Sequence, residues 1–463
     1  MSAIDKDTTA AAIASAVSAG KATAAAVVEH VLQRIDTLDE TYNAFTAVVA
    51  GRARQKAAAI DAAIAAGKAV GPLTGVPFAV KNLIDIAGLP TLAGSRINAD
   101  NPPAARDATL VQRLEAAGAI LVGGLNMGEY AYDFTGRNAH VGPSCNPRDP
   151  TRMTGGSSGG SGAAVAGGLV PLALGSDTNG SIRVPSSLCG TFGLKPTYGR
   201  LSRTGAFLFC DSLDHLGPLA RSVRDLAASF DVMQGPDAAD PVCTERPPEP
   251  TLSRLDDGIA GLRIAIAGDD FEHPLEPVAA TAVATVAKAL GATHKVALPG
   301  TARARGCASL ITTAEGGTLH LSRLRTRAAD FDPDTRERFM AGALTPAAWY
   351  IQAQRFRRQY RQRVLEALQD VDVLIAPATP MTAPRLDQIT TTISGVEMPV
   401  RAILGLFTQP FSFIGLPAVA APLQQSGGLP IAVQLIAKPF DEQAALRTAH
   451  WLERRGICAA PAA

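Results

Sequence analysis

Residues 154–203 carry the densest signal in the chain: TGGSSGGSGAAVAGGLVPLALGSDTNGSIRVPSSLCGTFGLKPTYGRLSR. A glycine-serine run opens this stretch, and the apolar segment AAVAGGLV, which has helical character, follows at once. Flexible linkers share the glycine-serine composition, but a linker has no reason to lead directly into core-forming sequence. A second serine next to glycine, Ser181, follows 24 residues after Ser157. We therefore expect the stretch to belong to the core and to carry both serines on turns.

Helices alternate with short apolar strands on both sides of this stretch. Alanine-rich helices are expected within residues 7–36, as two segments that each begin at a threonine, and at about 52–66. The predicted strands cover 76–80, which leads into Lys81, the end of 108–126, and parts of 261–268 and 371–380. Helices that alternate with fully apolar strands predict an α/β fold whose sheet is covered by helices on both faces.

The length of 463 residues allows several domains or one large α/β domain. Residues 235–250, GPDAADPVCTERPPEP, are rich in proline and charge, which is typical of a linker or of a long surface connection. We favour the connection and expect a single domain over 1–463. Its parts would be a helical segment at 1–70, a core at 71–235, and a second half of the sheet at 236–463 with a helical insertion at about 300–365.

The composition excludes several classes of protein. Lys and Arg number 43 against 42 Asp and Glu, so the chain lacks the basic excess of a protein that binds nucleic acid through its surface charge. The six cysteines include no C-x-x-C pair, which argues against a zinc ribbon or a redox dithiol. The N-terminus does not resemble a signal peptide and no apolar run is long enough to span a membrane, so we expect a cytoplasmic protein without membrane contact.

Ser181 is a candidate nucleophile, and successive amides at Thr178, Asn179, Gly180 and Ser181 could surround one oxygen. A serine nucleophile needs a base. Nothing marks any of the seven histidines as that base. Lys81 is the better candidate because it ends an apolar run, and burial lowers the pKa of a lysine. A phosphate-binding loop is disfavoured because G-x-x-x-x-G-K-[ST] is absent.

Three blocks in this order resemble the amidase signature family: GVPFAVKNLID (75–85), the 154–203 stretch, and GLPAVAAPLQQSGGLPIAVQLIAKPFDE (415–442). The resemblance implies the fold of that family, a large mixed and mostly parallel β-sheet between helices. It also implies a Ser–cis-Ser–Lys triad in which Ser181 is the nucleophile and Lys81 is the base. Ser157 would follow a cis peptide bond from Gly156 and connect the two. An acyl-enzyme would form and ammonia would leave, without metal or cofactor.

The resemblance also assigns supporting roles around the nucleophile. Asp177 and Arg183 are expected to form an ion pair that holds the loop; the alternative is that Arg183 binds a substrate carboxylate. Ser158 is expected to hydrogen-bond within the same network. Asn179 departs from the family, since many members have glycine there, and its side chain would narrow the pocket or contact substrate.

Within the family, blocks such as TAEGGTLHL (313–321) and AWYIQAQRFRRQYR (348–361) resemble members that release ammonia from a small anionic urea-like amide of the 1-carboxybiuret type. Oxamate or a related ureide is an alternative substrate, and the glutaminase (A) subunit of a tRNA-dependent amidotransferase is an alternative function. The residues expected to bind substrate are Tyr132, His320, Arg323, Arg325 and Arg357. The resemblance further implies a small helical accessory protein, in a homodimer or heterotetramer, and no direct contact with nucleic acid.

Overall fold

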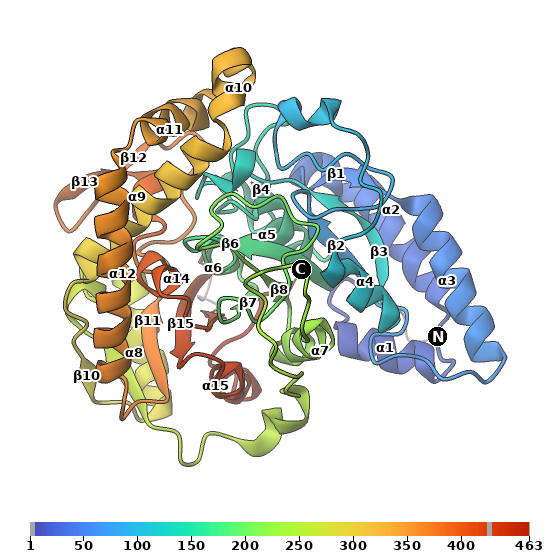
Figure 1. Cartoon of the computed structure of the whole chain (residues 1–463). Helices are drawn as coiled ribbons and strands as arrows, with labels where there is room; N and C mark the ends of the chain where they lie inside the picture. The colour runs from blue at the N-terminus through green and yellow to red at the C-terminus, as the bar shows by residue number, and fades with distance from the viewer. Residues whose placement is uncertain (1–4, 424–427, 463) are drawn as a thin grey trace.

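A large sheet organises the chain, and the computed structural model describes residues 5–423 and 428–462 of it (Figure 1). Eleven strands form this sheet in the order β1-β3-β2-β6-β8-β7-β14-β15-β11-β9-β10. Their bounds are β1 Phe45–Val48, β2 Pro77–Lys81, β3 Ile120–Leu125, β6 Leu172–Asp177, β7 Phe192–Lys195, β8 His215–Ala220, β9 Ile264–Ala267, β10 Lys295–Val296, β11 Val373–Pro377, β14 Ala418–Leu423 and β15 Ile431–Ala437. Two small hairpins stand apart from it, β4 Cys145–Asn146 with β5 Asp149–Met153, and β12 Thr390–Ile393 with β13 Val396–Pro399.

The mixed sheet is confirmed, but parallel pairs do not predominate in it. β2 is parallel to β3 and β6, and β9 is parallel to β10 and β11. From β6 to β11, every neighbouring pair in the middle of the sheet is antiparallel. Antiparallel strands need no crossover helix, and none separates β7 from β8 or β14 from β15 among the described residues. The apolar sequence of the strands did not reveal their direction, because these antiparallel strands are buried as completely as the parallel ones.

Fifteen helices are assigned in the described part of the chain. Their bounds are α1 Ala10–Ser18, α2 Ala24–Tyr42, α3 Ala50–Ala65, α4 Thr109–Ala116, α5 Gly159–Ala166, α6 Arg183–Cys189, α7 Val223–Met233, α8 Pro277–Leu290, α9 Thr301–Leu319, α10 Leu321–Thr326, α11 Pro333–Ala343, α12 Ala347–Ala367, α13 Val400–Ile403, α14 Gln409–Phe413 and α15 Glu442–Arg454. The threonines expected at the first two helices are the caps: Thr9 accepts from the amide of Ala12, and Thr23 from that of Ala26.

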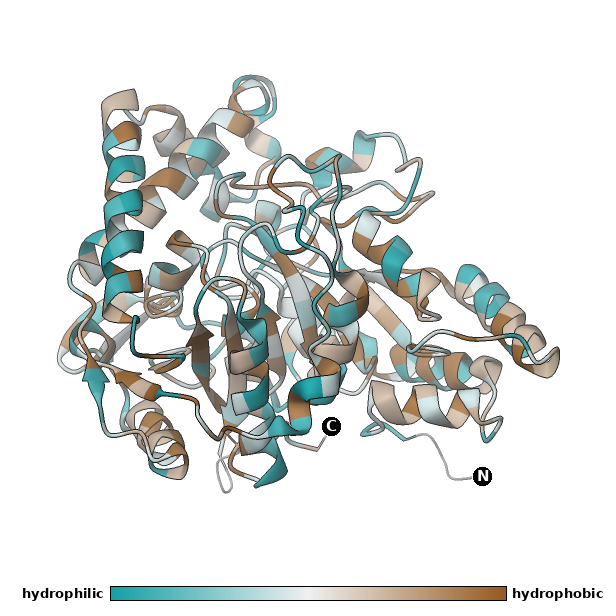
Figure 2. Cartoon of the chain, turned by 60° about the horizontal axis from the view of Figure 1, so that its bottom comes forward, coloured by the Kyte–Doolittle hydropathy of each residue, from teal (hydrophilic) through white to brown (hydrophobic). Residues whose placement is uncertain are grey.

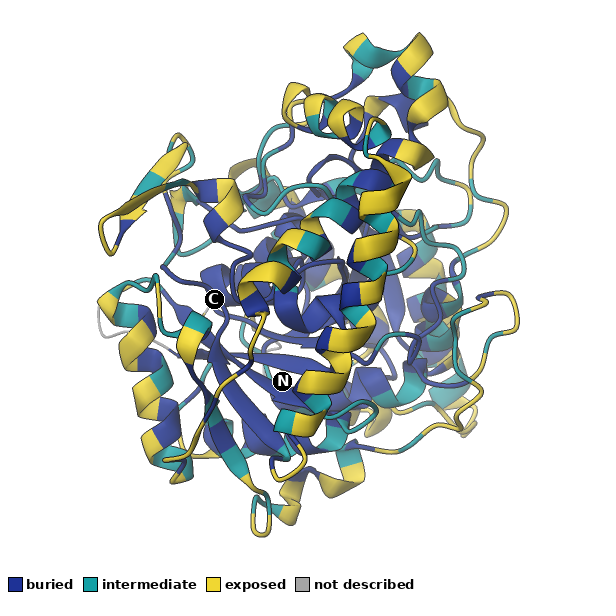
Figure 3. Ribbon diagram, turned by 60° about the vertical axis from the view of Figure 1, so that its left-hand side comes forward, coloured by how far each residue is buried: buried dark blue, intermediate teal, exposed yellow. Residues whose placement is uncertain are grey.

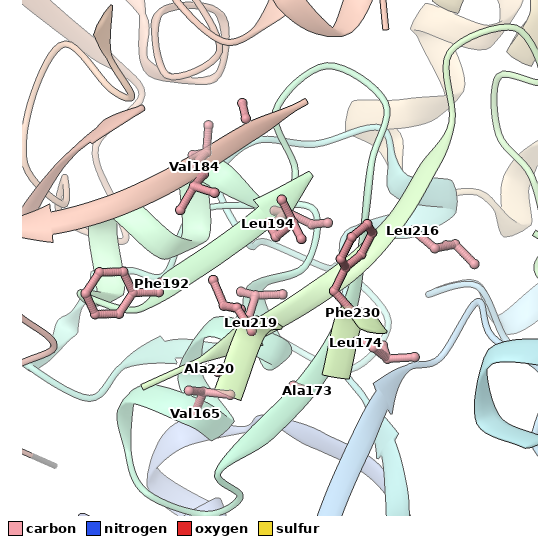
Figure 4. Packing of buried hydrophobic residues seen from close by; sticks show 14 of the residues in the cluster. Val165, Ala173, Leu174, Val184, Phe192, Leu194, Leu216, Leu219, Ala220 and Phe230 are labelled. Atoms are coloured by element: carbon pink, nitrogen blue, oxygen red, sulfur yellow. The ribbon is translucent and has the colours of Figure 1, made fainter. Parts of the chain in front are cut away.

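Helices cover the middle of the sheet on both faces. α5 and α6 contact each other and the central strands. α7 and α15 form a second pair, which also contacts the central strands. In Figure 4, Val165 of α5 and Phe230 of α7 lie among strand residues such as Phe192, Leu194 and Leu219. The strands are the most apolar part of the molecule, while the helices turn polar residues outward (Figure 2).

The long helices α9, α11 and α12 pack together at one side of the sheet, near the β12–β13 hairpin (Figure 1). Figure 3 brings this side forward and shows that the helices keep their exposed residues on the outside. Within residues 5–423 and 428–462, no helix has both the length and the apolarity required to cross a bilayer.

Candidate active site

Lys81 ends β2 and is completely buried. Its Nζ donates to three hydroxyl oxygens: Ser157 Oγ at 2.6 Å, Ser176 Oγ at 2.8 Å and Ser158 Oγ at 3.0 Å. Ser176 lies near the carboxyl end of β6, the parallel neighbour of β2, so two strand ends meet at this amine. Burial lowers the pKa of Lys81 to about 7, although the negative charges of Asp214, Asp177 and Asp133 act against this shift. The amine is therefore partly neutral near pH 7 and suited to accept a proton.

Ser157 follows a cis peptide bond from Gly156, as the resemblance implied. A side chain at Gly156 would lie 2.8 Å from the Gly136 nitrogen and 2.9 Å from the Asp133 carbonyl oxygen, which explains the glycine there. The amide of Gly156 donates to the Phe134 carbonyl at 2.8 Å. The loop before α5 is thus fixed against residues 133–136, with the Ser157 hydroxyl on Lys81.

Ser181 lies on the loop between β6 and α6 and lines a cavity of about 350 Å³. Its hydroxyl has no hydrogen-bond partner in the described part of the chain, so it is available to a bound molecule. Gly180 has φ +141°, and a Cβ there would lie 2.1 Å from Thr408 Oγ1. Only glycine fits this close approach, which positions Ser181 toward the cavity.

The loop that carries Ser181 is held by the ion pair expected between Asp177 and Arg183. Arg183 Nε and Nη2 donate to the two carboxylate oxygens of Asp177 at 3.0 Å each, and both side chains are fully buried. Burial disfavours the charged carboxylate, but Arg183 outweighs it and holds the pKa of Asp177 below its ordinary value. The remaining nitrogen, Nη1, donates to Gln434 Oε1 at 2.7 Å. The alternative role of Arg183 as a substrate ligand is therefore wrong, because every nitrogen has an internal partner.

Thr178 and Asn179 line the same cavity as Ser181. Thr178 Oγ1 donates to Asp214 at 2.5 Å, and Asn179 Nδ2 donates to Thr312 Oγ1 at 2.9 Å. The side-chain oxygen of Asn179 is buried and has no partner among the described residues. Asn179 lines the cavity, while its narrowing of the cavity or contact with substrate and an oxyanion role for the amides of 178–181 stay predictions.

Ser158 lies within the network, as expected. Besides accepting from Lys81, its hydroxyl donates to the Ser176 carbonyl at 3.1 Å and accepts from the Ser176 amide at 3.2 Å. Ser176 itself is a contact of Lys81 that the sequence analysis missed, because nothing in LALGSD distinguishes a serine at a strand end from an ordinary core serine.

Tyr132 also lines the cavity, and its hydroxyl shares a hydrogen bond of 2.6 Å with Thr313 Oγ1. His320, by contrast, lies outside it. Its ring centroid is 4.0 Å from that of Tyr130 and 4.7 Å from that of Phe339. Burial lowers the pKa of His320 to about 3, so this side chain is a neutral core aromatic and not an anion ligand.

The three arginines expected to bind substrate do not line the cavity either. Arg323 lies over the Phe207 ring, with 5.6 Å from its guanidinium carbon to the centroid, and Arg325 is exposed on α10. Arg357 donates to the carbonyls of Ser212, at 2.8 Å, and Phe413, and so joins α12 to neighbouring segments. These predictions were wrong because the neighbouring sequence does not distinguish an arginine with a structural role from one that binds substrate.

Two other arginines, Arg338 of α11 and Arg401 of α13, line the cavity instead. Arg338 lies over the Tyr132 ring at 3.9 Å and donates through Nε to the Asp334 carbonyl at 2.7 Å. Its Nη2 donates to the Tyr132 carbonyl. Sequence reasoning missed both arginines because Arg338 occurs in a polar segment typical of solvent-exposed sequence and Arg401 is a lone charge in an apolar segment. Over the described ranges, no set of three or more His, Cys, Asp or Glu side chains is arranged to hold a metal ion.

Comparison with known proteins gives consistent matches over nearly the whole chain. The model of a family described as Amidase matches residues 26–446. AtzE, which is part of the 1-carboxybiuret hydrolase of Pseudomonas sp. (strain ADP), is 52% identical over 443 residues, which cover 95% of this chain and 97% of that protein. The A component of the glutamyl-tRNA(Gln) amidotransferase of Chloroflexus aurantiacus (strain ATCC 29366 / DSM 635 / J-10-fl) is 39% identical over 469 residues, with coverages of 95% and 94%.

Solved structures agree with these matches. A chain from a vestigial protein complex, said to reveal the evolutionary origins of an s-triazine catabolic enzyme, superposes with a TM-score of 0.96 at 51% identity, covering 98% of this chain and 99% of that one. The A component of the glutamyl-tRNA(Gln) amidotransferase of Thermotoga maritima superposes with a TM-score of 0.82 at 30% identity, covering 99% and 98%.

Proposed function

Because the chain belongs to the amidase signature family, we propose that it hydrolyses the amide bond of a small anionic urea-like substrate of the 1-carboxybiuret type and releases ammonia. The observation that carries this proposal is the 2.6 Å contact between the buried Lys81 amine and Ser157, beside a small cavity lined by Ser181, Arg338 and Arg401. The identity of 52% with a component of a 1-carboxybiuret hydrolase supports it.

In the proposed mechanism, neutral Lys81 accepts a proton from Ser157 while Ser157 accepts one from Ser181. The Ser181 oxygen then attacks the amide carbonyl, and the amides of residues 178–181 stabilise the negative oxygen. The proton returns through Ser157 to the leaving nitrogen, which departs as ammonia. One water molecule hydrolyses the acyl-enzyme, so the sum is amide plus water giving acid plus ammonia.

The charge of the cavity favours an anionic substrate. Arg338 Nη1 and the whole guanidinium group of Arg401 have no hydrogen-bond partner within the described residues. The one carboxylate in the described lining of the cavity, Asp133, already accepts from the amides of Thr135 and Gly136 at 2.7 Å each. A carboxylate or carbamate group of the substrate would therefore find free guanidinium donors.

An ammonia-release assay tests this function with freshly prepared 1-carboxybiuret, oxamate and glutamine as separate substrates. We expect the highest kcat/KM with 1-carboxybiuret. Preference for oxamate would favour a related ureide amidase. Release from glutamine alone would favour the glutaminase component of an amidotransferase, a function supported by relatives at 39% identity.

We also propose that the chain works with a small helical accessory protein, in a homodimer or heterotetramer. The support is the superposition on a chain that was solved as part of a protein complex. Co-purification of a small helical protein with the tagged chain, followed by mass measurement of the intact assembly, would test this. A monomer that is fully active alone would contradict it.

A further inference from the structure

We propose that a second cavity, next to the active-site cavity, is an outer binding site that captures small carboxylate or carbamate anions before they reach Ser181. This inference rests on the proposed function. The outer cavity has a volume of about 280 Å³. Asp133, Arg338 and Arg401 line both cavities, whereas Arg137, Thr390 and Pro399 line only the outer one.

Three guanidinium groups face this outer cavity, and each keeps nitrogen atoms free. Arg137 donates to the carbonyls of Leu386, at 3.1 Å through Nε, and Gln388, at 3.4 Å through Nη2. The Nη1 atoms of Arg137 and Arg338 have no hydrogen-bond partner among the residues that the structure describes. The same is true of all guanidinium nitrogens of Arg401. Such planar donors match the two oxygens of a carboxylate or carbamate.

The two acidic side chains of the outer cavity, Asp133 and Asp334, cancel this charge only in part. Asp133 accepts hydrogen bonds from the amides of Thr135, Gly136 and Arg137, at 2.7, 2.7 and 3.2 Å. These three amides donate to Oδ2, and Thr135 Oγ1 donates to Oδ1 at 2.9 Å, so both oxygens have donors within the same loop. Asp334 is the only other carboxylate in the described lining, so the three guanidinium groups leave an excess of one positive charge over the two carboxylates.

The position of Arg338 and Arg401 connects the two sites. An anion held in the outer cavity can move toward Ser181 while it keeps contact with these two side chains, because both line the inner cavity as well. A cleft with an excess of one sign of charge raises the local concentration and the association rate of an oppositely charged ligand. The β12–β13 hairpin supplies one wall through Thr390 and Pro399 (Figure 1).

Charge substitutions at Thr390 test the outer site, since this exposed strand residue lines only the outer cavity. We compare Thr390→Glu and Thr390→Lys with Gln359→Glu and Gln359→Lys, which make the same charge changes on the exposed face of α12. Oxamate is the probe. Its Kd is measured by calorimetry in the Ser181→Ala background, and its kcat/KM by ammonia release in the wild-type background, at low and high salt.

At low salt, we expect Thr390→Glu to weaken oxamate binding and lower kcat/KM by about fivefold, mainly through KM, as electrostatic steering predicts. Thr390→Lys should leave oxamate binding unchanged or tighten it, and high salt should reduce both effects. The Gln359 variants should have the same oxamate Kd as Ser181→Ala and the same kcat/KM as the wild type. Equal behaviour of Thr390→Glu and Gln359→Glu, or no oxamate binding at millimolar concentrations, would overturn the outer site.

The two proposals fail in different ways. If oxamate binding responds to Thr390→Glu but the wild type releases no ammonia from any anionic amide, the outer site stands and the proposed function fails. If the wild type releases ammonia and Thr390→Glu behaves as its control does, the function stands and the outer site fails.

Discussion

At the scale of single residues, the proposed mechanism depends on the protonation of one amine. Lys81 is buried among hydroxyl groups, and no carboxylate is among its hydrogen-bond partners in the described chain. Burial therefore lowers its pKa to about 7 from an ordinary value of 10.5. Serine hydroxyls can hold this amine by hydrogen bonds, but they carry no negative charge that would stabilise its protonated form. A lysine that acts as a base requires such surroundings.

The pH dependence of kcat/KM should follow this amine. We expect activity to rise with pH, to be half-maximal near pH 7, and to level off above it, because the base is the neutral form. The free energy of unfolding should likewise gain from rising pH between about 7 and 10.5, where the unfolded chain holds this proton and the folded chain does not. A kcat/KM that falls as pH rises through 7 would contradict the assignment.

Ser181→Ala should abolish turnover, with a loss of at least about a thousandfold, because the proposed acyl-enzyme forms on the Ser181 oxygen. Ser309→Ala is the matched control, since Ser309 lines the same cavity but does not contact Lys81. Ammonia release measures both variants. Substantial residual activity in Ser181→Ala would mean that the nucleophile is another residue.

Sequence reasoning identified most of the hydroxyl network and part of the cavity lining, but it missed Ser176 and the two arginines of the cavity. Lys81, Ser157 and Ser158 belong to blocks whose order and spacing resemble a known family, and the structure brings them together. Arg338 and Arg401 come from α11 and α13, far along the chain, and only tertiary packing places them beside Ser181. His320 is the opposite case: it was predicted to bind substrate, but its ring is buried in the core among aromatic side chains.

At the scale of the elements, the loop from β6 to α6 is held by a buried ion pair. The Asp177–Arg183 pair connects the end of β6 to the first residue of α6, and Ser181 lies between them. The amide of Ile182 also donates to Asp177, at 3.2 Å. This loop is therefore fixed from within the fold, independently of any bound substrate.

Removal of one partner of this pair should destabilise the fold strongly. Arg183→Met leaves Asp177 buried without its counter-charge, which typically costs about 3–5 kcal/mol. Denaturant unfolding measures the change in the free energy of unfolding. Arg54→Met, which breaks an exposed ion pair with Glu29, is the control and should change stability little. Equal stability of the two variants would contradict a structural role for the buried pair.

The predicted elements agree with the structure where periodicity is strong. The alanine-rich helices, the strand that ends at Lys81 and the strands at 264–267 and 373–377 are all present. The pairing direction was not predictable, because burial on both faces gives the same apolar run in either orientation. The β12–β13 hairpin also escaped prediction, since its exposed strands lack an apolar face.

At the scale of the whole molecule, the large sheet brings distant segments to one site. β2 and β6 deliver Lys81 and the Ser181 loop, while α9, α11 and α13 supply the cavity walls from the second half of the chain. Identity of 52% over 95% of the chain to one relative is consistent with this arrangement as a shared framework.

The six cysteines should be dispensable for activity. All six are free thiols, and three of them, Cys189, Cys210 and Cys458, are buried. Burial raises the pKa of the Cys189 thiol to about 12, which makes it unreactive. We expect iodoacetamide under native conditions to leave activity within about twofold. Loss of activity in proportion to one alkylated cysteine, found by mass spectrometry, would contradict this.

Peptide mapping by mass spectrometry after treatment with a fluorophosphonate probe is the most direct test of the relay from Lys81 through Ser157 to Ser181. The wild type should carry the adduct on Ser181, and Lys81→Ala and Ser157→Ala should react at least about a hundredfold more slowly. An adduct on a different residue, or a Lys81→Ala variant that reacts as fast as the wild type, would contradict the relay.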